Sequence, residues 1–179
     1  MQVSEQGVQS KGRQRHQVIP RSLILLTSTN PATDEEEVLL IKGAPTKRLW
    51  ANKYNGLGGH IEADEDVQRA ALRELHEETG LTPASLILRG IVHINTGHNA
   101  QGDPNPGVMM FVFCGHADSR RVQPSAEGTP EWIPAARLAD FPLVDDLYEL
   151  IPLALANGPM LFGHYSPQPD GSMYYRFSA

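Results

Sequence analysis

The chain contains one cysteine in 179 residues, so it cannot form an intramolecular disulfide. It has no apolar stretch near the ~20 residues of a membrane-spanning helix, and no hydrophobic N-terminal segment of the kind found in secretory signals. Basic residues are also few: 15 Lys and Arg face 21 Asp and Glu, a formal net charge of −6. Since this balance repels polyanions on average, we expect a protein that does not bind nucleic-acid polymers. Together with the other absences, it leads us to expect a cytoplasmic protein that does not bind membranes.

The rest of the composition is typical of a globular protein, with 40% hydrophobic and 20% charged residues. A chain of this length suits one domain with a sizeable core. Residues 1–16 are polar and partly basic, which predicts a disordered tail before a single domain over residues 17–179; a basic arm that recruits phosphates is the alternative. Cys114 lies in an apolar run, so we expect it in the core.

Hydrophobic patterning predicts several short strands and few helices. The first two strands are expected to pair as a hairpin, and a second hairpin is expected around Pro-Gln-Pro-Asp-Gly near the C-terminus. The expected strands are residues 18–29, 38–41, 86–94, 108–114, 131–133, 161–165 and 173–177. A long loop is expected over residues 45–58, and a helix capped by Asp145 or Asp146 is expected to run through Leu155.

Residues 59–81 read GHIEADEDVQRAALRELHEETGL and carry the strongest signal. Glu74, Glu77 and Glu78 fall within roughly a third of the circumference of the helix expected here. Such like-charge neighbours destabilise a helix by ~0.2–0.5 kcal/mol each, and the helix dipole disfavours acids just before Gly80. Apolar residues share this arc, so we expect it to face the protein. Hard oxygen ligands of this kind predict magnesium or manganese, and a solvated acidic helix is the alternative.

Neighbouring residues fit a site for a metal and a phosphate. The Gly58-Gly59 pair allows the backbone to approach a ligand closely. Asp64 is expected to cap the helix at its start, and Gly80 to end it. Arg73 lies beside the acids, where its guanidinium can orient one carboxylate through two parallel hydrogen bonds.

The same stretch resembles the signature box of the Nudix hydrolases. Gly59, Glu65 after five intervening residues, and residues 73–81 after seven more match every defined position of that box. The resemblance implies an α/β/α sandwich around a mixed β-sheet. It further implies hydrolysis of a nucleoside diphosphate linked to another group, with Mg²⁺ or Mn²⁺ as the cofactor.

The resemblance also assigns roles to the residues of the box. Glu74 and Glu77 are the catalytic candidates, because in the family the first glutamate often positions or deprotonates the water; which one acts as the base stays open. Arg73 would orient Glu74, and Glu65 would support the site from behind. The implied metal ligands are the carbonyl of Gly59 and the carboxylates of Glu74, Glu77 and Glu78.

Two residues outside the box are candidates on weaker signals. Glu127 lies in a segment similar to the one from which MutT-like members supply a further acid, and an exposed loop acid is the alternative. Lys53, with Lys47 and Arg48, lies in the basic loop before the box. These side chains could meet the phosphate tail of a substrate or could be solvated surface groups.

The substrate candidates rest on a looser similarity to the MutT-like enzymes that hydrolyse oxidised purine nucleoside triphosphates. It is carried by residues 50–59 and by residues 143–148. By this similarity Asp145 and Asp146 read the purine edge, and Asn55 lies below the base. A buried aspartate that stays protonated can serve as donor or acceptor. Simple helix capping is the alternative for both aspartates.

One position departs from those enzymes. Leu143 stands where the animal enzyme has a tryptophan that stacks on the base, an interaction of ~1–3 kcal/mol. We therefore expect either loose purine selectivity or another aromatic, Trp50 or Tyr54, in that role.

Two other functions remain open. A hydrolase of non-nucleotide diphosphates would ignore the base and have a strongly basic pocket. The second open function is that of a domain that senses a ligand without turning it over. Such domains usually lose acids of the box, and all of these acids are present here. The sequence leaves the oligomeric state open.

Overall fold

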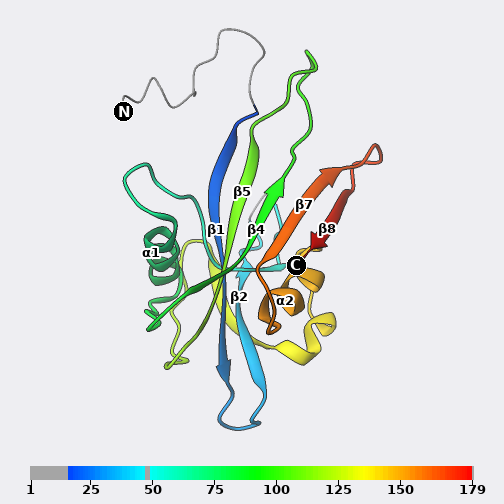
Figure 1. Ribbon diagram of the computed structural model, residues 1–179. Helices are drawn as coiled ribbons and strands as arrows, with labels where there is room; N and C mark the ends of the chain where they lie inside the picture. Colours follow the sequence, from blue (N-terminus) through cyan, green and yellow to red (C-terminus); the bar gives the residue numbers. More distant parts are fainter. Residues whose placement is uncertain (1–15, 47–48, 179) are drawn as a thin grey trace.

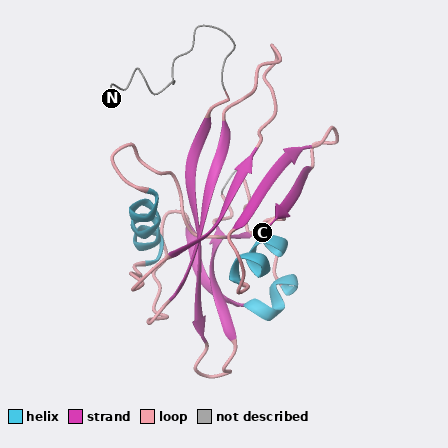
Figure 2. Cartoon of the chain, viewed as in Figure 1, coloured by secondary structure: helices cyan, strands magenta, loops and turns pink. Residues whose placement is uncertain are grey.

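The protein is described by a computed structural model over residues 16–46 and 49–178 (Figure 1), so all but His16 of the tail expected over residues 1–16 lies outside the described residues. Strands make up most of the regular secondary structure (Figure 2). The strands are β1 (Val18–Thr29), β2 (Glu36–Gly43), β3 (Tyr54–Asn55), β4 (Ile87–Ile94), β5 (Gly107–His116), β6 (Gly128–Pro134), β7 (Leu161–Pro167) and β8 (Met173–Ser178). The helices are α1 (Val67–Thr79), the 3-10 helix η2 (Ala135–Asp140) and α2 (Leu147–Leu155).

These strands form one eight-stranded mixed sheet in the order β3-β2-β1-β5-β4-β7-β8, with β6 paired to β2. The pairs β1 with β5 and β4 with β7 are parallel, and the other pairs are antiparallel. β1 lies near the middle of the sheet, and its residues 22–28 are buried, whereas residues 18–21 are exposed.

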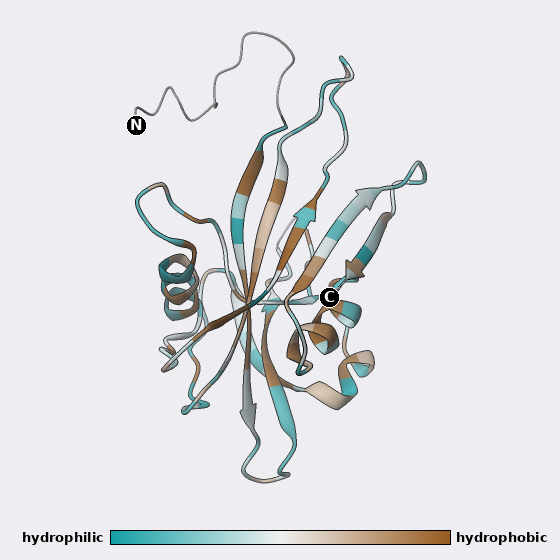
Figure 3. Cartoon of the chain, viewed as in Figure 1, coloured by the Kyte–Doolittle hydropathy of each residue, from teal (hydrophilic) through white to brown (hydrophobic). Residues whose placement is uncertain are grey.

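Helices cover both faces of the sheet, which confirms the expected α/β/α sandwich (Figure 1). Side chains alternate along β1: Ile24 faces α1, and Leu25 faces α2. The α1 layer includes Ala71 and Leu75, both fully buried. The α2 helix is apolar over much of its surface, whereas α1 has an apolar side and a hydrophilic side (Figure 3).

The sequence predicted most elements within a few residues. β1 has the expected bounds, and both expected hairpins form. β3 was not expected, because it is two residues long, lies within the loop expected over 45–58 and forms only by pairing with β2. Cys114 packs against the α2 core, as expected, and is half-buried there; burial raises the pKa of its thiol to about 11.

The start of α1 differs from the expected one. The N-cap is Asp66, not Asp64: Asp66 Oδ1 accepts hydrogen bonds from the backbone N–H groups of Gln68 and Arg69, both at 2.9 Å. Several acids follow one another here, and local sequence does not decide which one turns inward. The end of α1 is as expected, with Gly80 in the left-handed region at φ 76°.

This assignment predicts that Asp66→Ala lowers the free energy of unfolding by about 1 kcal/mol, because the two helix N–H groups lose their acceptor. Asp64→Ala is the matched control, since it removes the same side chain from an exposed position two residues away. Urea unfolding followed by circular dichroism measures both. An equal loss in the two variants would show that charge, not capping, stabilises this turn.

No helix in the part of the chain that the structure describes has the length and apolar character to cross a membrane.

Candidate active site

The double glycine before α1 is fixed against β1. Ser22 N–H donates to the Gly59 carbonyl at 2.9 Å, and Ile24 N–H donates to the Leu57 carbonyl at 2.8 Å. Gly58 has φ 123°, and a Cβ there would come within 2.4 Å of the Ser22 carbonyl oxygen. Only glycine therefore fits position 58, and backbone hydrogen bonds to β1 hold the segment on both sides of it.

Two glutamates of α1 reach this double glycine. A Cβ on Gly59 would lie 2.5 Å from the Glu74 carboxylate, so that carboxylate occupies the space that glycine leaves open. Glu78 is 6% exposed, and its Oε2 accepts a hydrogen bond from Gly58 N–H at 2.8 Å. The structure thus brings Glu74, Glu78 and the glycine backbone together at the inner side of α1.

Glu77 does not join them, which corrects the expectation of three inward acids. Its side chain is 58% exposed, and its carboxylate lies 3.3 Å from Arg73 Nη1. On the helix Glu77 lies to the Arg73 side of Glu74, and Glu78 lies to the other side, toward the core. Within residues 16–46 and 49–178, no three Asp, Glu, His or Cys side chains converge in a geometry that would hold a metal ion.

Arg73 connects the acids, but not in the expected way. Its two parallel hydrogen bonds go to Glu65, at 2.6 and 3.1 Å, and Glu74 receives a single bond at 3.0 Å. Arg73 also donates to the His60 carbonyl at 3.1 Å. The hydrogen bonds from Arg73 lower the pKa of the Glu65 carboxyl, and those to Glu65 raise the pKa of Arg73. Arg73 is therefore fixed by Glu65 and in turn fixes Glu74.

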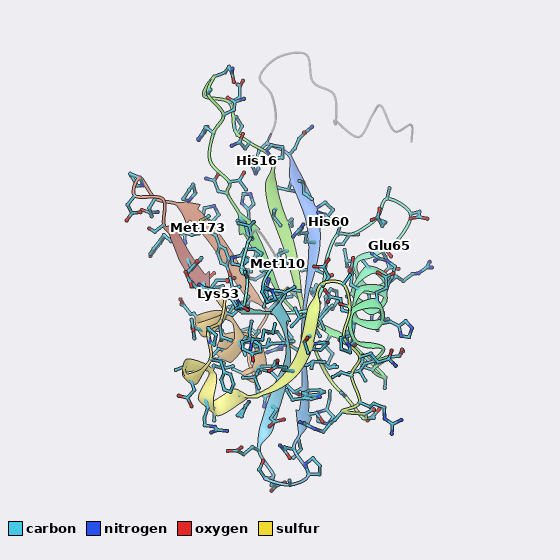
Figure 4. The ribbon with its side chains drawn as sticks, turned by 180° about the vertical axis from the view of Figure 1, so that it is seen from behind. His16, Lys53, His60, Glu65, Met110 and Met173 are labelled. Carbon is cyan, nitrogen blue, oxygen red and sulfur yellow. The ribbon has the colours of Figure 1, made fainter. Side chains whose placement is uncertain are left out.

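A cavity of about 430 Å³ opens beside the double glycine, which lies within the usual range for a small-molecule site. Its lining includes Gly58 and Gly59, next to His60, and also Asp145 and Asp146. Figure 4 shows His60 and Lys53, the ion-pair partner of Asp145, on opposite sides of Met110, so the two glycines and the two aspartates mark the two ends of the cavity. Between the ends the walls are mainly apolar: Leu23, Ile94, Val108, Met110, Met173 and Tyr175. Met110 and Met173, labelled in Figure 4, mark the walls from β5 and β8.

The two aspartates at the far end have different environments. Asp145 has a side chain 72% exposed and forms a 2.8 Å ion pair with Lys53. Asp146 occupies the N-cap position of α2, but its side chain makes no capping hydrogen bond; it accepts one from the Tyr165 hydroxyl at 2.9 Å instead. Burial raises the pKa of Asp146, and the neighbouring Asp145 charge adds to this, although the Tyr165 bond opposes it.

The structure distinguishes between Trp50 and Tyr54, the two aromatic residues that could stack on a base. Trp50 is 49% exposed and lines the cavity, as does Asn55. Tyr54 is 4% exposed and does not line it; its hydroxyl donates to Glu131 at 2.6 Å, and burial together with this bond raises its pKa to about 12. Tyr54 is thus excluded as a stacking platform. Leu143 is fully buried in the α2 core, away from the cavity surface.

The remaining candidates lie apart from this cavity. Glu127 is exposed in the turn before β6 and is not among the lining residues. Lys53 is 40% exposed and reaches the cavity rim only through Asp145. Lys47 and Arg48 lie outside the described residues.

A family model described as the NUDIX domain matches residues 25–154, which include α1, its acids and both aspartates at the far end of the cavity. The chain belongs to the Nudix family. This confirms the resemblance drawn from the box. Nudix hydrolases act on pyrophosphate linkages and generally use divalent metal ions.

Known proteins add detail to this Nudix assignment. The chain is 33% identical over 95 residues to a zebrafish (Danio rerio) protein named oxidized purine nucleoside triphosphate hydrolase, covering 52% of this chain and 56% of the relative. It thus spans about half the length of that relative.

Solved structures show the fold. The mutator MutT protein of Bacillus halodurans superposes with a TM-score of 0.72 at 22% identity, over 89% of this chain and 97% of that one. The Nudix domain of Shewanella oneidensis NrtR, complexed with ADP ribose, gives 0.65 at 20% identity, over 86% and 97%.

Arg21 and Tyr165 line this Nudix cavity, and neither was expected there from the sequence. Both lie in strands that the sequence did predict. Alternation along β1 places Arg21 on the same face as Leu23, so its facing could have been inferred. The contacts of the two residues could not have been inferred, because they join distant segments. Arg21 contacts His60, 39 residues away, and Tyr165 contacts Asp146, 19 residues away.

Proposed function

We propose that this Nudix protein hydrolyses the pyrophosphate linkage of a nucleoside triphosphate, or of a related nucleoside diphosphate derivative, with Mg²⁺ or Mn²⁺ as cofactor. One observation carries the proposal. The carboxylates of Glu74 and Glu78 meet the double glycine at one end of a cavity whose other end presents Asp145 and Asp146. A phosphate chain can lie at the first end while a base occupies the second.

The donor set at the first end fits a hard divalent cation. Glu74 and Glu78 supply carboxylate oxygens, and the Gly59 carbonyl keeps one lone pair beyond its bond to Ser22. Glu77, exposed and held by one 3.3 Å contact to Arg73, is a ligand in this proposal only once it turns inward. A bound cation would neutralise phosphate charge and lower the pKa of water.

The protein's own groups then have separate tasks. Glu74, held by Arg73, positions or deprotonates the attacking water, and Glu77 is the other candidate for the base. Glu65 keeps Arg73 in place. Glu127 remains a candidate accessory ligand from the turn before β6.

For the base we propose an oxidised or related purine. Burial raises the pKa of Asp146, and in its protonated form this carboxyl can donate as well as accept a hydrogen bond, whereas Asp145 beside Lys53 offers acceptor oxygens. Trp50 is placed to stack on the base, and Asn55 lines the same cavity. The name of the zebrafish relative agrees with this substrate class.

If the aspartates read the base, Asp145→Asn and Asp146→Asn should change the ranking of guanine, oxidised guanine, adenine and pyrimidine triphosphates more than they change maximal turnover. A mismatched edge leaves buried polar groups unpaired, at a cost of ~1–3 kcal/mol each. The measurement is kcat/KM for each triphosphate. Variants that keep the parent ranking and lose only stability would identify the aspartates as structural.

The pH dependence of unfolding checks the state of Asp146 separately. Because its pKa is raised in the folded protein, its stabilising contribution is present at low pH and is lost as the pH rises through the folded-state value. Asp146→Asn should abolish this loss. An unchanged stability–pH profile would contradict the raised pKa of Asp146.

A panel of substrates tests the proposal against its alternatives. We expect nucleoside triphosphates to be cleaved faster in magnesium than prenyl or inositol diphosphates, because the cavity walls are apolar and its far end carries acids. The ADP ribose bound by the NrtR domain makes ADP ribose the third class to include. Binding without turnover of every member would establish a sensor, and cleavage of the non-nucleotide diphosphates alone would replace the proposed function.

A further inference from the structure

Arg21 carries an unneutralised positive charge at the cavity. It is exposed on β1, and among the described residues that line the cavity it is the single basic one. No carboxylate in the described part of the chain forms an ion pair with it. Arg73, by contrast, is shared among Glu65, Glu74 and Glu77. The two guanidinium groups therefore differ: Arg73 forms ion pairs with the protein's own acids, and Arg21 is available to a ligand.

The position of Arg21 is set by His60. Arg21 Nε and Nη2 lie 3.2 and 2.8 Å from His60 Nε2, and the two residues face each other across an antiparallel bridge. The His60 carbonyl is bound by Arg73, so His60 connects the cavity with the acid network. Figure 4 shows His60 between Met110 of the cavity wall and Glu65 beside α1. Within the described residues, Arg21 Nη1 has no hydrogen-bond partner and remains free to donate.

Among the described residues that line the cavity, the other acid–base side chains are acids rather than bases. Asp145 and Asp146 lie at the far end, and Glu74 and Glu78 lie behind the double glycine. A phosphate chain that enters this space therefore has one fixed cation of the described lining to bind, in addition to any metal ion. A guanidinium is well suited to this, because its planar donors match two phosphate oxygens.

We propose that Arg21, oriented by His60, binds the phosphate group that links the nucleoside to the scissile linkage, and so selects ligands that carry a phosphate at that point. The inference rests on the proposed function. Arg21 contributes binding that is the same before and during the reaction, so its loss raises KM and leaves kcat nearly unchanged. His60 acts through Arg21 as a positioning residue.

Calorimetric binding of the nucleoside monophosphate and of the free nucleoside, with magnesium, tests this on the full chain. Both ligands carry the nucleobase of the triphosphate that the wild type cleaves with the highest kcat/KM. Arg21→Gln should weaken binding of the monophosphate by roughly 10- to 100-fold, because a charge-assisted contact is lost, and should leave binding of the nucleoside unchanged. Arg21→Lys should recover part of the affinity. His60→Ala should weaken the monophosphate less than Arg21→Gln does.

Arg176→Gln is the control for overall charge, because Arg176 is exposed on β8 and does not line the cavity. It should bind both ligands as the wild type does. Equal affinity of Arg21→Gln and wild type for the monophosphate would overturn the inference, as would a matching loss for the nucleoside. If the wild type cleaves nucleotides and Arg21→Gln has the same KM as the wild type, only the role of Arg21 is refuted. If the wild type neither binds nor cleaves nucleotides, the proposed function is refuted, and this inference with it.

Discussion

Glu78→Gln is expected to lower turnover by orders of magnitude while the fold survives. The amide keeps the shape of the side chain, and its oxygen can still accept the hydrogen bond from Gly58 N–H. What disappears is a negative charge that is 6% exposed and that the proposed cation requires. Because glutamine keeps the shape of the side chain and the bond to Gly58 N–H, the melting temperature should stay close to that of the wild type. Steady-state turnover in magnesium and thermal unfolding measure the two effects.

Glu62→Gln is the matched control for that variant, because it makes the same chemical change at an exposed position just before α1. We expect wild-type turnover from it. Full activity of Glu78→Gln would remove Glu78 from the metal site, and a collapse of its melting temperature would make its role structural.

Gly59→Ala should be the second severe variant, with a loss of about 100-fold, the effect of misplacing a catalytic group by ~1 Å. Its Cβ would lie 2.5 Å from the Glu74 carboxylate, which must move away from the double glycine. Position 59 does not have a positive φ, and the group that must yield is the end of a flexible side chain. The free energy of unfolding should therefore change little while kcat falls.

Gly158→Ala provides the comparison, since a Cβ there meets nothing within 4 Å. It should match the wild type in both turnover and urea midpoint. If Gly59→Ala retains wild-type kcat, the contact between Gly59 and Glu74 does not matter for the reaction.

Local sequence predicted the elements whose signals are local. β1 is a long β-branched and aliphatic run, and the end of α1 is set by Gly80, so both were found at their bounds. β3 has two residues and exists because β2 lies beside it, which no local pattern reports. The choice of Asp66 over Asp64 as the N-cap depends on how the loop approaches α1. That approach is fixed by hydrogen bonds of the double glycine to β1, far away in the sequence.

The site was predictable to the extent that it lies in one segment. The acids, the double glycine and Arg73 came from residues 58–81, and the structure brings Glu74 and Glu78 together there. Helical periodicity placed Glu77 in the same arc, but the spacing alone could not distinguish the core side of α1 from the Arg73 side. Tyr165 and Arg21 were missed because their roles come from tertiary contacts between strands and loops.

Product analysis tests the central claim most directly. The full chain is incubated with a purine nucleoside triphosphate and magnesium, and the released phosphate is scored as pyrophosphate or orthophosphate, with EDTA in a parallel sample. The account predicts nucleoside monophosphate and pyrophosphate in equal amounts, and none of either with EDTA or with Glu78→Gln. Release of orthophosphate alone, or cleavage that persists in EDTA, would contradict it.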